Sequence, residues 1–80
     1  MSLTFPQYRK YKNDQAFFKI LSEEVFEEVK KMPGGYVLYL HEVKILPDRN
    51  LMQDMLYDFD SYWDEISAKE YDKVKSKADQ

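Results

Sequence analysis

The spacing of hydrophobic residues along the chain changes between the period of a strand and the period of a helix. Near the start, two short β-prone runs at residues 7–12 and 15–21 are separated by Asn13-Asp14. Because Asn and Asp tolerate positive φ, we expect the two runs to form a hairpin. Alternation gives the second run one apolar face, formed by Ala16, Phe18 and Ile20.

The next segment, residues 22–31, has the features of a helix. Ser22 can cap its first turn, glutamates follow, and lysines lie in its last turn, so both ends suit the helix dipole. Its apolar face is formed by Val25, Phe26 and Val29. The sequence Pro-Gly-Gly at 33–35 then ends the helix.

Residues 36–46 are the clearest strand in the chain. The first half is apolar on both faces, which is typical of a strand inside a sheet. The second half alternates, with His41 on one face and Glu42 on the other. Because neighbouring side chains of a strand point to opposite faces, these two cannot act together in acid–base chemistry. We expect His41 to be a hydrogen-bonded structural histidine.

Two more helices are predicted after this strand. Pro47 and Asp48 suit the start of the first, with Asp48 as its N-cap. Its apolar stripe has helical spacing and consists of Leu51, Met52, Met55, Leu56 and Phe59. A short strand at 62–66 leads to Ser67, which caps the last helix in a capping box with Glu70.

These elements predict the order ββαβαβα and the α+β class. Three amphipathic helices would cover a sheet of about four strands in a two-layer arrangement. The sheet is predicted to be mixed or antiparallel, and the strand–helix–strand connections favour a mixed one. No linker or low-complexity segment interrupts the chain, so we expect residues 1–80 to form a single small domain.

Residues 17–31 and 62–76 follow nearly the same pattern. Each runs from an aromatic pair through a serine to an aromatic residue and a valine. Both are therefore expected to be a strand that ends at a serine, whose hydroxyl caps the helix that follows. An ancestral duplication would explain the similarity, and so would convergence of any strand–serine–helix junction on this pattern.

Composition limits the chemistry that the chain can perform. It has no cysteine and one histidine, which excludes disulfides and thiolate metal sites and disfavours a zinc site. We therefore expect no metal and no other cofactor. No apolar run approaches the roughly 20 residues of a membrane span, and the lack of cysteine fits a reducing compartment, so a cytoplasmic protein without a membrane partner is predicted. Aromatic residues form 16% of the chain, enough for a small core or for self-association.

Charge is unevenly distributed around a net value of −3. Residues 1–13 carry only basic charges and residues 50–65 only acidic ones. The acidic total argues against a dedicated nucleic-acid-binding protein. The separation of charge favours head-to-tail contact between copies, although salt screens such an attraction.

Candidate catalytic and metal-binding patterns are few. Arg49 follows a strand–helix junction, where it can contact a bound anion, and it can equally be solvated or ion-paired. The acidic segment 58–65 has calcium-loop spacing, but Trp63 stands where such a loop needs glycine. No serine has the sequence context of a nucleophile. We assign no catalytic residue and do not expect an enzyme.

Two binding surfaces are candidates. The first is an exposed aromatic surface, which predicts a non-enzymatic interaction or assembly module that forms a homo-oligomer or binds another protein. Its residues are Tyr36, Tyr39, Tyr57, Tyr62 and Trp63. The alternative is weak binding of single-stranded nucleic acid by interleaved aromatic and basic residues of the first hairpin. Those residues are Tyr8, Arg9, Lys10, Tyr11 and Lys12.

A third hypothesis is a small-ligand or enzymatic site. It would lie around Arg49 and His41. Such a site requires a pocket that joins these two side chains with a third polar group.

Two stretches, FPQYRKY at 5–11 and ILPDRNLMQDML at 45–56, resemble a group of small conserved bacterial proteins of unknown function. The resemblance extends over most of the chain. It implies a bacterial origin, and it brings no function and no catalytic residue with it.

Overall fold

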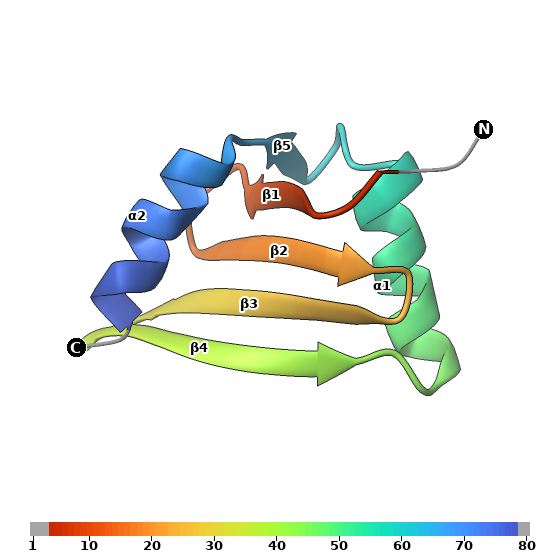
Figure 1. Cartoon of the computed structure of the whole chain (residues 1–80), viewed down its shortest axis with the longest axis horizontal. Coiled ribbons are helices and arrows are strands. Elements are labelled where there is room, and N and C mark those ends of the chain that lie inside the picture. The colour runs from red at the N-terminus through yellow and green to blue at the C-terminus, as the bar shows by residue number, and fades with distance from the viewer. Residues whose placement is uncertain (1–3, 79–80) are drawn as a thin grey trace.

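Five strands form a single antiparallel sheet in the computed structural model, which describes residues 4–78 (Figure 1). Four of them come first along the chain: β1 (Gln7–Tyr11), β2 (Ala16–Ser22), β3 (Val25–Met32) and β4 (Gly35–Glu42). Helix α1 (Leu46–Tyr57), strand β5 (Trp63–Glu65) and helix α2 (Ala68–Ala78) follow. The spatial order is β4-β3-β2-β1-β5, so β5 returns to pair with β1 while β4 forms the opposite edge.

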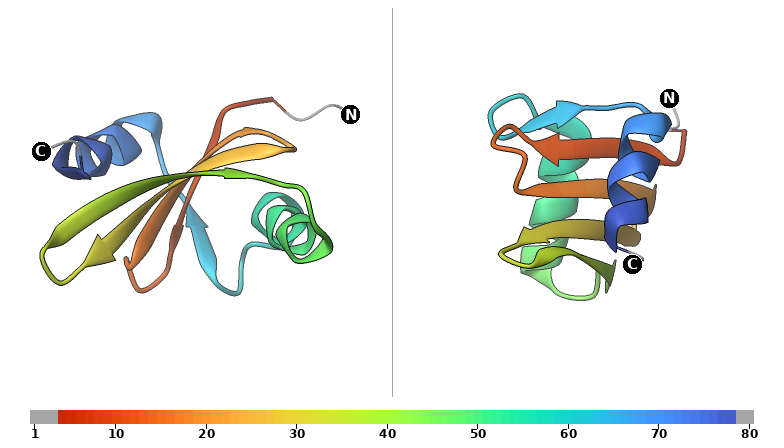
Figure 2. Two further views of the ribbon diagram at one scale, coloured as in Figure 1. Left: turned by 90° about the horizontal axis from the view of Figure 1, so that it is seen from below. Right: turned by 90° about the vertical axis from the view of Figure 1, so that its left-hand side faces the viewer.

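The two helices cover opposite faces of the sheet at opposite ends (Figure 2). Helix α1 packs on the face that carries Ala16, Phe18 and Ile20 of β2, here called the α1 face. Helix α2 packs on the face that carries Phe17, here called the α2 face. Each face is covered at one end and open at the other. The arrangement is therefore helix–sheet–helix rather than the predicted two layers.

Each covered end of the sheet has its own hydrophobic core. The core beneath α1 consists of Ala16, Phe18, Ile20, Phe26, Met52, Met55, Leu56 and Trp63. The core beneath α2 consists of Phe17, Val29, Tyr71 and Val74. Buried apolar surface contributes about 25 cal/mol per Å² to folding, so a chain this small depends on both cores.

The predicted helix at residues 22–31 is wrong, because this segment forms a turn and then strand β3. Phe26 and Val29 are three positions apart, which in a helix would place them on one face. In β3 they point to opposite faces, Phe26 into the core beneath α1 and Val29 into the core beneath α2. A sheet with a core on each face thus produces an apolar spacing that resembles that of a helix.

The Pro-Gly-Gly sequence, expected to end that helix, instead connects β3 to β4. Met32 pairs with Gly35, so Pro33 and Gly34 form the turn of a hairpin. The φ angle of Gly35 is +143°, a conformation that favours glycine.

The remaining predictions of the fold are confirmed in part. The α+β class and the first hairpin are confirmed. Over residues 4–78 the fold has five strands rather than about four, and two helices rather than three. Of the two predicted kinds of sheet, mixed or antiparallel, the antiparallel one is observed. The order is therefore ββββαβα. The prediction that 36–46 lies inside the sheet is wrong, because β4 is an edge strand.

The two helices begin in different ways. Ser67 Oγ accepts a hydrogen bond from the N–H of Glu70 at 3.1 Å, so the predicted cap of α2 is confirmed. Helix α1 has Ile45 at its N-cap, without a side-chain hydrogen bond, and Asp48 lies in the first turn instead of capping it. Of these two helices, neither has the length and apolar character needed to cross a membrane.

Candidate functional site

β4 is the most exposed strand of the sheet, and four of its exposed residues are large and apolar. Val37 and Tyr39 point to the α1 face, where they are 39% and 40% exposed. Leu38 and Leu40 point to the α2 face, where they are 36% and 64% exposed. Edge strands are usually protected by lysine, proline or a bulge, because their backbone groups can pair with another chain. The strand Gly35–Glu42 has none of these protections.

Within residues 4–78, alternate residues of β4 have backbone groups without a hydrogen-bond partner. The N–H of Val43 donates to the carbonyl of Glu24 at 2.7 Å, which extends the β3–β4 ladder by one pair. Hydrogen-bonded and non-hydrogen-bonded pairs alternate along an antiparallel ladder, so the odd-numbered residues of β4 bond to β3. The even-numbered residues direct their N–H and C=O groups away from the sheet: Tyr36, Leu38, Leu40 and Glu42.

The opposite edge of the sheet is built differently. β5 has only three residues, and the first of them, Trp63, is buried in the core beneath α1. Lys12, which directly follows β1, donates a hydrogen bond to Asp64 at 2.9 Å. This hydrogen bond lowers the pKa of the Asp64 carboxyl. A short, charged strand offers few groups to another chain. The two edges therefore differ in what they can bind.

On the α1 face, the surface of β4 continues into an aromatic and polar group. The ring of His41 stacks on Phe26 with centroids 4.8 Å apart, and its Nε2 lies 2.9 Å from a Glu28 carboxylate oxygen. His41 is thus a hydrogen-bonded histidine, as expected. The ring of Tyr39 lies 6.1 Å from that of His41. These contacts fix the side chains beside the exposed strand.

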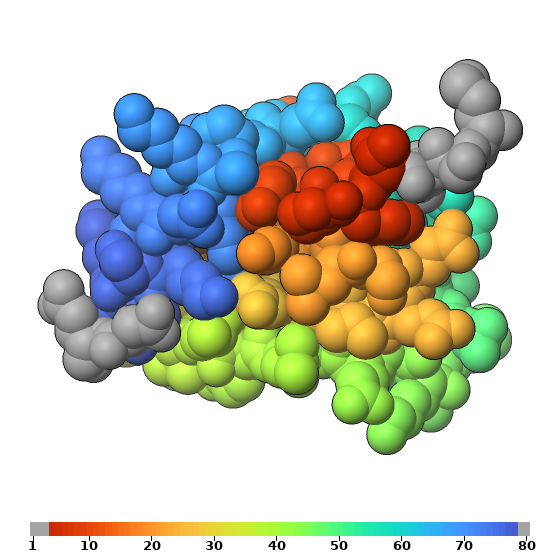
Figure 3. All heavy atoms as spheres, viewed as in Figure 1, coloured from red at the N-terminus to blue at the C-terminus, as the bar shows by residue number. Residues whose placement is uncertain are grey.

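On the α2 face, helix α2 covers one end of the sheet and leaves the surfaces of β1, β2 and β4 open beside it (Figure 3). Leu38 and Leu40 of β4 are exposed on this face. Leu21 lies at the irregular end of β2, where the register with β3 shifts, and is 37% exposed. These leucines leave apolar surface that neither helix covers.

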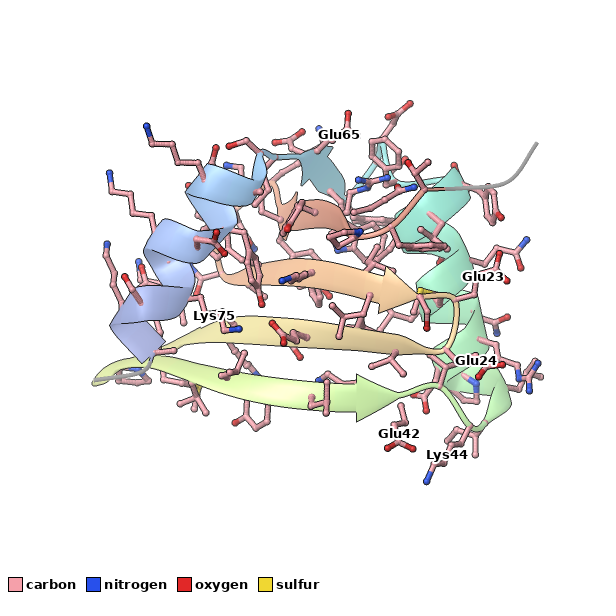
Figure 4. All side chains as sticks on the ribbon, viewed as in Figure 1. Glu23, Glu24, Glu42, Lys44, Glu65 and Lys75 are labelled. Atoms are coloured by element: carbon pink, nitrogen blue, oxygen red, sulfur yellow. The ribbon has the colours of Figure 1, made fainter. Side chains whose placement is uncertain are left out.

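A partly buried polar contact joins α2 to β3. Glu27 accepts a hydrogen bond from the hydroxyl of Tyr71 at 3.0 Å and another from Nζ of Lys75 at 3.3 Å. Lys75 reaches from α2 over the sheet in Figure 4. Burial, and then the neighbouring Glu27 carboxylate, raise the pKa of the Tyr71 hydroxyl. This contact is structural and lies beneath the helix.

The two ends of β4 carry opposite charges. Beside its start, Lys30 and Lys31 of β3 pair with Val37 and Tyr36, and neither lysine has a salt-bridge partner within residues 4–78. Acidic side chains lie near its end: Glu23, Glu24 and Glu42 (Figure 4). Lys44 neutralises one of them, because it pairs with Glu42 at 3.2 Å.

The predicted aromatic surface is divided by the fold. Tyr36 and Tyr39 lie on β4. Tyr57 is the last residue of α1 and Tyr62 precedes β5; both are exposed, but neither lies on β4. Trp63 is 4% exposed and belongs to the core, so it does not contribute to a surface of the isolated chain.

Three residues of the exposed β4 surface, Val37, Leu38 and Leu40, are not among those selected from the sequence. A signal for them exists, because residues 36–40 are apolar on both faces. That pattern indicates an interior strand when the strand order is unknown. Only the topology turns it into an exposed surface.

The cation at the centre of the first hairpin is buried. Arg9 is 2% exposed, its Nε donates to the carbonyl of Met55 at 2.9 Å, and its guanidinium lies 4.1 Å from the centre of the Phe59 ring. Burial lowers the pKa of the Arg9 guanidinium, and the nearby Glu65 carboxylate opposes this shift. Arg9 therefore serves the core beneath α1.

The other residues of that hairpin are spread over both faces. Lys10 pairs with the Asp14 carboxylate, which raises the pKa of Lys10, and Lys12 pairs with Asp64. Tyr8 points to the α2 face. Tyr11 points to the α1 face, where it stacks on an indole in the core. The hairpin does not bring its aromatic and basic side chains onto one exposed surface.

Arg49 lines a surface pocket of about 530 Å³ that runs along α1. Glu23 and Glu24 line the same pocket, and their carboxylates oppose the binding of an anion there. His41 does not line it, so this pocket does not join Arg49 to His41. Among residues 4–78, no group of three or more His, Asp or Glu side chains is placed to hold a metal ion.

Comparison with known proteins adds no relative: no protein-family model matches the chain, and no curated protein or solved structure matches it significantly. The resemblance of residues 5–11 and 45–56 to small bacterial proteins stays a prediction. The structure itself defines the class of the molecule. It is a small α+β protein with an open, apolar sheet edge of the kind that can accept a further strand.

Proposed function

We propose that the protein is a small, non-enzymatic interaction module that associates with a second copy of itself through the surface of β4. One observation supports this most directly. An eight-residue edge strand exposes Val37, Leu38, Tyr39 and Leu40 together with free backbone groups. An edge of this kind gains both hydrogen bonds and apolar burial when another strand joins it.

The side chains that could take part in catalysis are engaged in structural contacts, which supports a module without catalytic activity. His41 is held between Phe26 and Glu28, and Arg9 is buried in a core. Both are engaged in contacts that stabilise the fold. A cytoplasmic location is part of the proposal, because a chain without cysteine suits a reducing compartment.

Binding of single-stranded nucleic acid is less well supported by the contacts. The cations that it would use are buried or paired: Arg9, Lys10 and Lys12. Backbone phosphates require accessible positive charge, since this charge supplies most of the affinity. This function stays a sequence-based prediction.

Sedimentation velocity over a range of micromolar concentrations tests the proposal. The wild-type chain is expected to form a dimer, and Leu40→Lys is expected to be monomeric, because it places a charge on the exposed apolar strand. Tyr62→Lys is the matched control. Its site is 68% exposed, against 64% for Leu40, and lies just before β5, at the opposite edge of the sheet. This variant should dimerise like the wild type.

A wild-type chain that stays monomeric over the whole range would contradict the proposal. A dimer that Tyr62→Lys disrupts and Leu40→Lys does not would also contradict it, since the contact would then lie away from β4. Circular dichroism establishes that each variant keeps the native fold.

A further inference from the structure

Resting on the proposed function, we infer the geometry of the dimer: β4 of one copy pairs antiparallel with β4 of the second copy, with the two Tyr39 residues facing each other across a two-fold axis. The sheets of the two copies then form one continuous sheet. The observations behind this are the free backbone groups of β4, the side chains on its two faces and the opposite charges at its ends.

Symmetry restricts the registers that are available. Two identical antiparallel strands are related by a two-fold axis perpendicular to the sheet, and this axis keeps each face on its own side. Residues that face each other must therefore come from the same face of β4. A residue must lie opposite itself at the axis, and the two candidates nearest the middle of the strand are Leu38 and Tyr39.

The free backbone groups favour Tyr39 at the axis. In this register Tyr36 pairs with Glu42 of the second copy, and Leu38 pairs with Leu40 of the second copy. All four outward-directed residues then form hydrogen-bonded pairs. With Leu38 at the axis, Glu42 would lie opposite Gly34, which belongs to the turn and not to the strand. That register forms fewer backbone hydrogen bonds.

The side chains also suit this register. On the α2 face, the exposed Leu38 and Leu40 of the two copies become cross-strand neighbours. On the α1 face, Tyr39 lies opposite Tyr39 of the second copy, and Val37 lies opposite His41 of the second copy. Apolar and aromatic cross-strand pairs of this kind each add roughly 0.2–1 kcal/mol to pairing in sheets in general.

Charge complementarity favours the antiparallel direction. The basic start of β4 comes to lie beside the acidic end of the second copy's β4. Glu42 of the second copy, which also pairs with Lys44 of its own chain, faces Tyr36, and Lys31 lies on the other side of Tyr36 on the same face. Two strand spacings separate the two charges, about 10 Å, which is close to the screening length at physiological salt.

The pairing also accounts for exposed residues next to the strand. Ile45 and Leu46 are 60% and 68% exposed where the chain leaves β4 to begin α1, at the same edge of the molecule (Figure 1). Antiparallel pairing brings the start of the second copy's β4 to this end of the strand. Both residues then lie beside the β3–β4 turn of the second copy.

The inferred dimer resolves the conflict between the sequence of β4 and its place in the sheet. Residues 36–40 have the composition of an interior strand, apolar on both faces, but β4 is an edge strand in the single chain. Pairing with a second copy places β4 inside a sheet. The pattern of the sequence then agrees with the structure.

Disulfide trapping tests the register directly, because the chain contains no cysteine and a single substitution reports one position. At the axis, non-hydrogen-bonded partners have Cα atoms about 4.5 Å apart, within the range of a disulfide. Tyr39→Cys is therefore expected to form a covalent dimer rapidly under mild oxidation. Leu38→Cys should form one more slowly, because its self-contact is diagonal. Tyr62→Cys, an exposed residue away from β4, is the control for random collision.

A proline variant tests the backbone pairing separately. The N–H of Leu40 points away from β3, so Leu40→Pro removes a hydrogen-bond donor from the dimer and none from the ladder within the chain. It is expected to be a folded monomer at concentrations where Leu40→Val, which keeps the N–H group, is a dimer. Sedimentation and circular dichroism measure both properties.

The outcomes separate this inference from the proposed function. A wild-type dimer in which Tyr39→Cys cross-links no faster than Tyr62→Cys would overturn the β4 pairing and leave self-association standing. Faster cross-linking of Leu38→Cys than of Tyr39→Cys would overturn the register. A monomeric wild type would remove the proposed function, and the inference with it.

Discussion

Residues 17–31 and 62–76 have similar sequences and different structures. The first segment forms most of β2, a turn and most of β3, whereas the second forms β5, a short connection and most of α2. Equivalent positions hold Ser22 and Ser67, Phe26 and Tyr71, Val29 and Val74, and Lys30 and Lys75. Differences at other positions therefore decide between a strand and a helix.

The two serines act in different local motifs. Ser22 Oγ accepts a hydrogen bond from the N–H of Glu24, two residues on, and the chain turns back as β3. Ser67 Oγ accepts one from the N–H of Glu70, three residues on, and the helix begins. The position equivalent to Glu70 is Val25, a β-branched residue that cannot complete a capping box. This position is thus one difference that separates the two local preferences.

Long-range pairing completes the difference. β3 has a strand on each side, because the turn after Met32 returns the chain as β4. No such turn follows α2 within the described residues, and its Tyr71 and Val74 share one helical face. In β3 the equivalent Phe26 and Val29 enter two different cores. The same apolar spacing therefore serves one core in a helix and two cores in a strand.

The largest expected effect comes from truncating the two equivalent valines. Val29 is fully buried in a central strand, so Val29→Ala is expected to lower the free energy of unfolding by about 2–3 kcal/mol. Val74 is slightly more exposed and lies in a helix, where alanine has the better propensity by roughly 0.5 kcal/mol. Val74→Ala should therefore lower the free energy of unfolding by only about 1 kcal/mol. Urea denaturation of both variants measures the difference.

Equal losses of unfolding free energy in the two variants would contradict this expectation. They would show that the core shared by the two valines, and not the strand or helix around each, sets the cost of truncation. Unchanged m-values are the control that both variants unfold from the same native state.

What sequence can predict follows from the same comparison. The cap of α2 is local, since Ser67 and Glu70 are three residues apart, and it was predictable. The structure of 22–31 was not, because it depends on whether Phe26 and Val29 meet one core or two. That depends on two helices distant in sequence, which cover opposite faces of the sheet.

The candidate site divides similarly. Tyr36 and Tyr39 were selected from the sequence as aromatic residues, although the run that contains them is apolar on both faces, which is typical of an interior strand. The exposure of Leu38 and Leu40 was not predictable, since it depends on strand order. Strands β3 and β4 extend the sheet outward from β2, while β5 joins at β1, so β4 is left at the edge.

A smaller effect is expected from the two serines. Ser67→Ala removes a helix N-cap and should lower the free energy of unfolding by about 1 kcal/mol. Ser22→Ala removes a hydrogen bond in an exposed turn, and its effect should stay within about 0.5 kcal/mol. Thermal and urea denaturation compare the two. A larger loss for Ser22→Ala would mean that the turn, and not the cap, depends on its serine.

The last effect, a change in the slope of stability at alkaline pH, separates the two equivalent aromatic residues, Phe26 and Tyr71. Burial and Glu27 raise the pKa of the Tyr71 hydroxyl, whereas Phe26 has no group that ionises. A tyrosine in the unfolded chain has a pKa of about 10, so the neutral buried hydroxyl contributes its full stabilisation below that pH. As the pH rises above this value, the unfolded chain loses the proton first and the stabilisation declines.

Tyr71→Phe should therefore lose stability less steeply than the wild type above that pH. Its native-state tyrosinate absorbance should match that of the wild type until unfolding begins. Identical alkaline unfolding of the two proteins would show that the hydroxyl of Tyr71 is accessible to solvent. The contribution of Tyr71 to stability would then come from its aromatic ring alone.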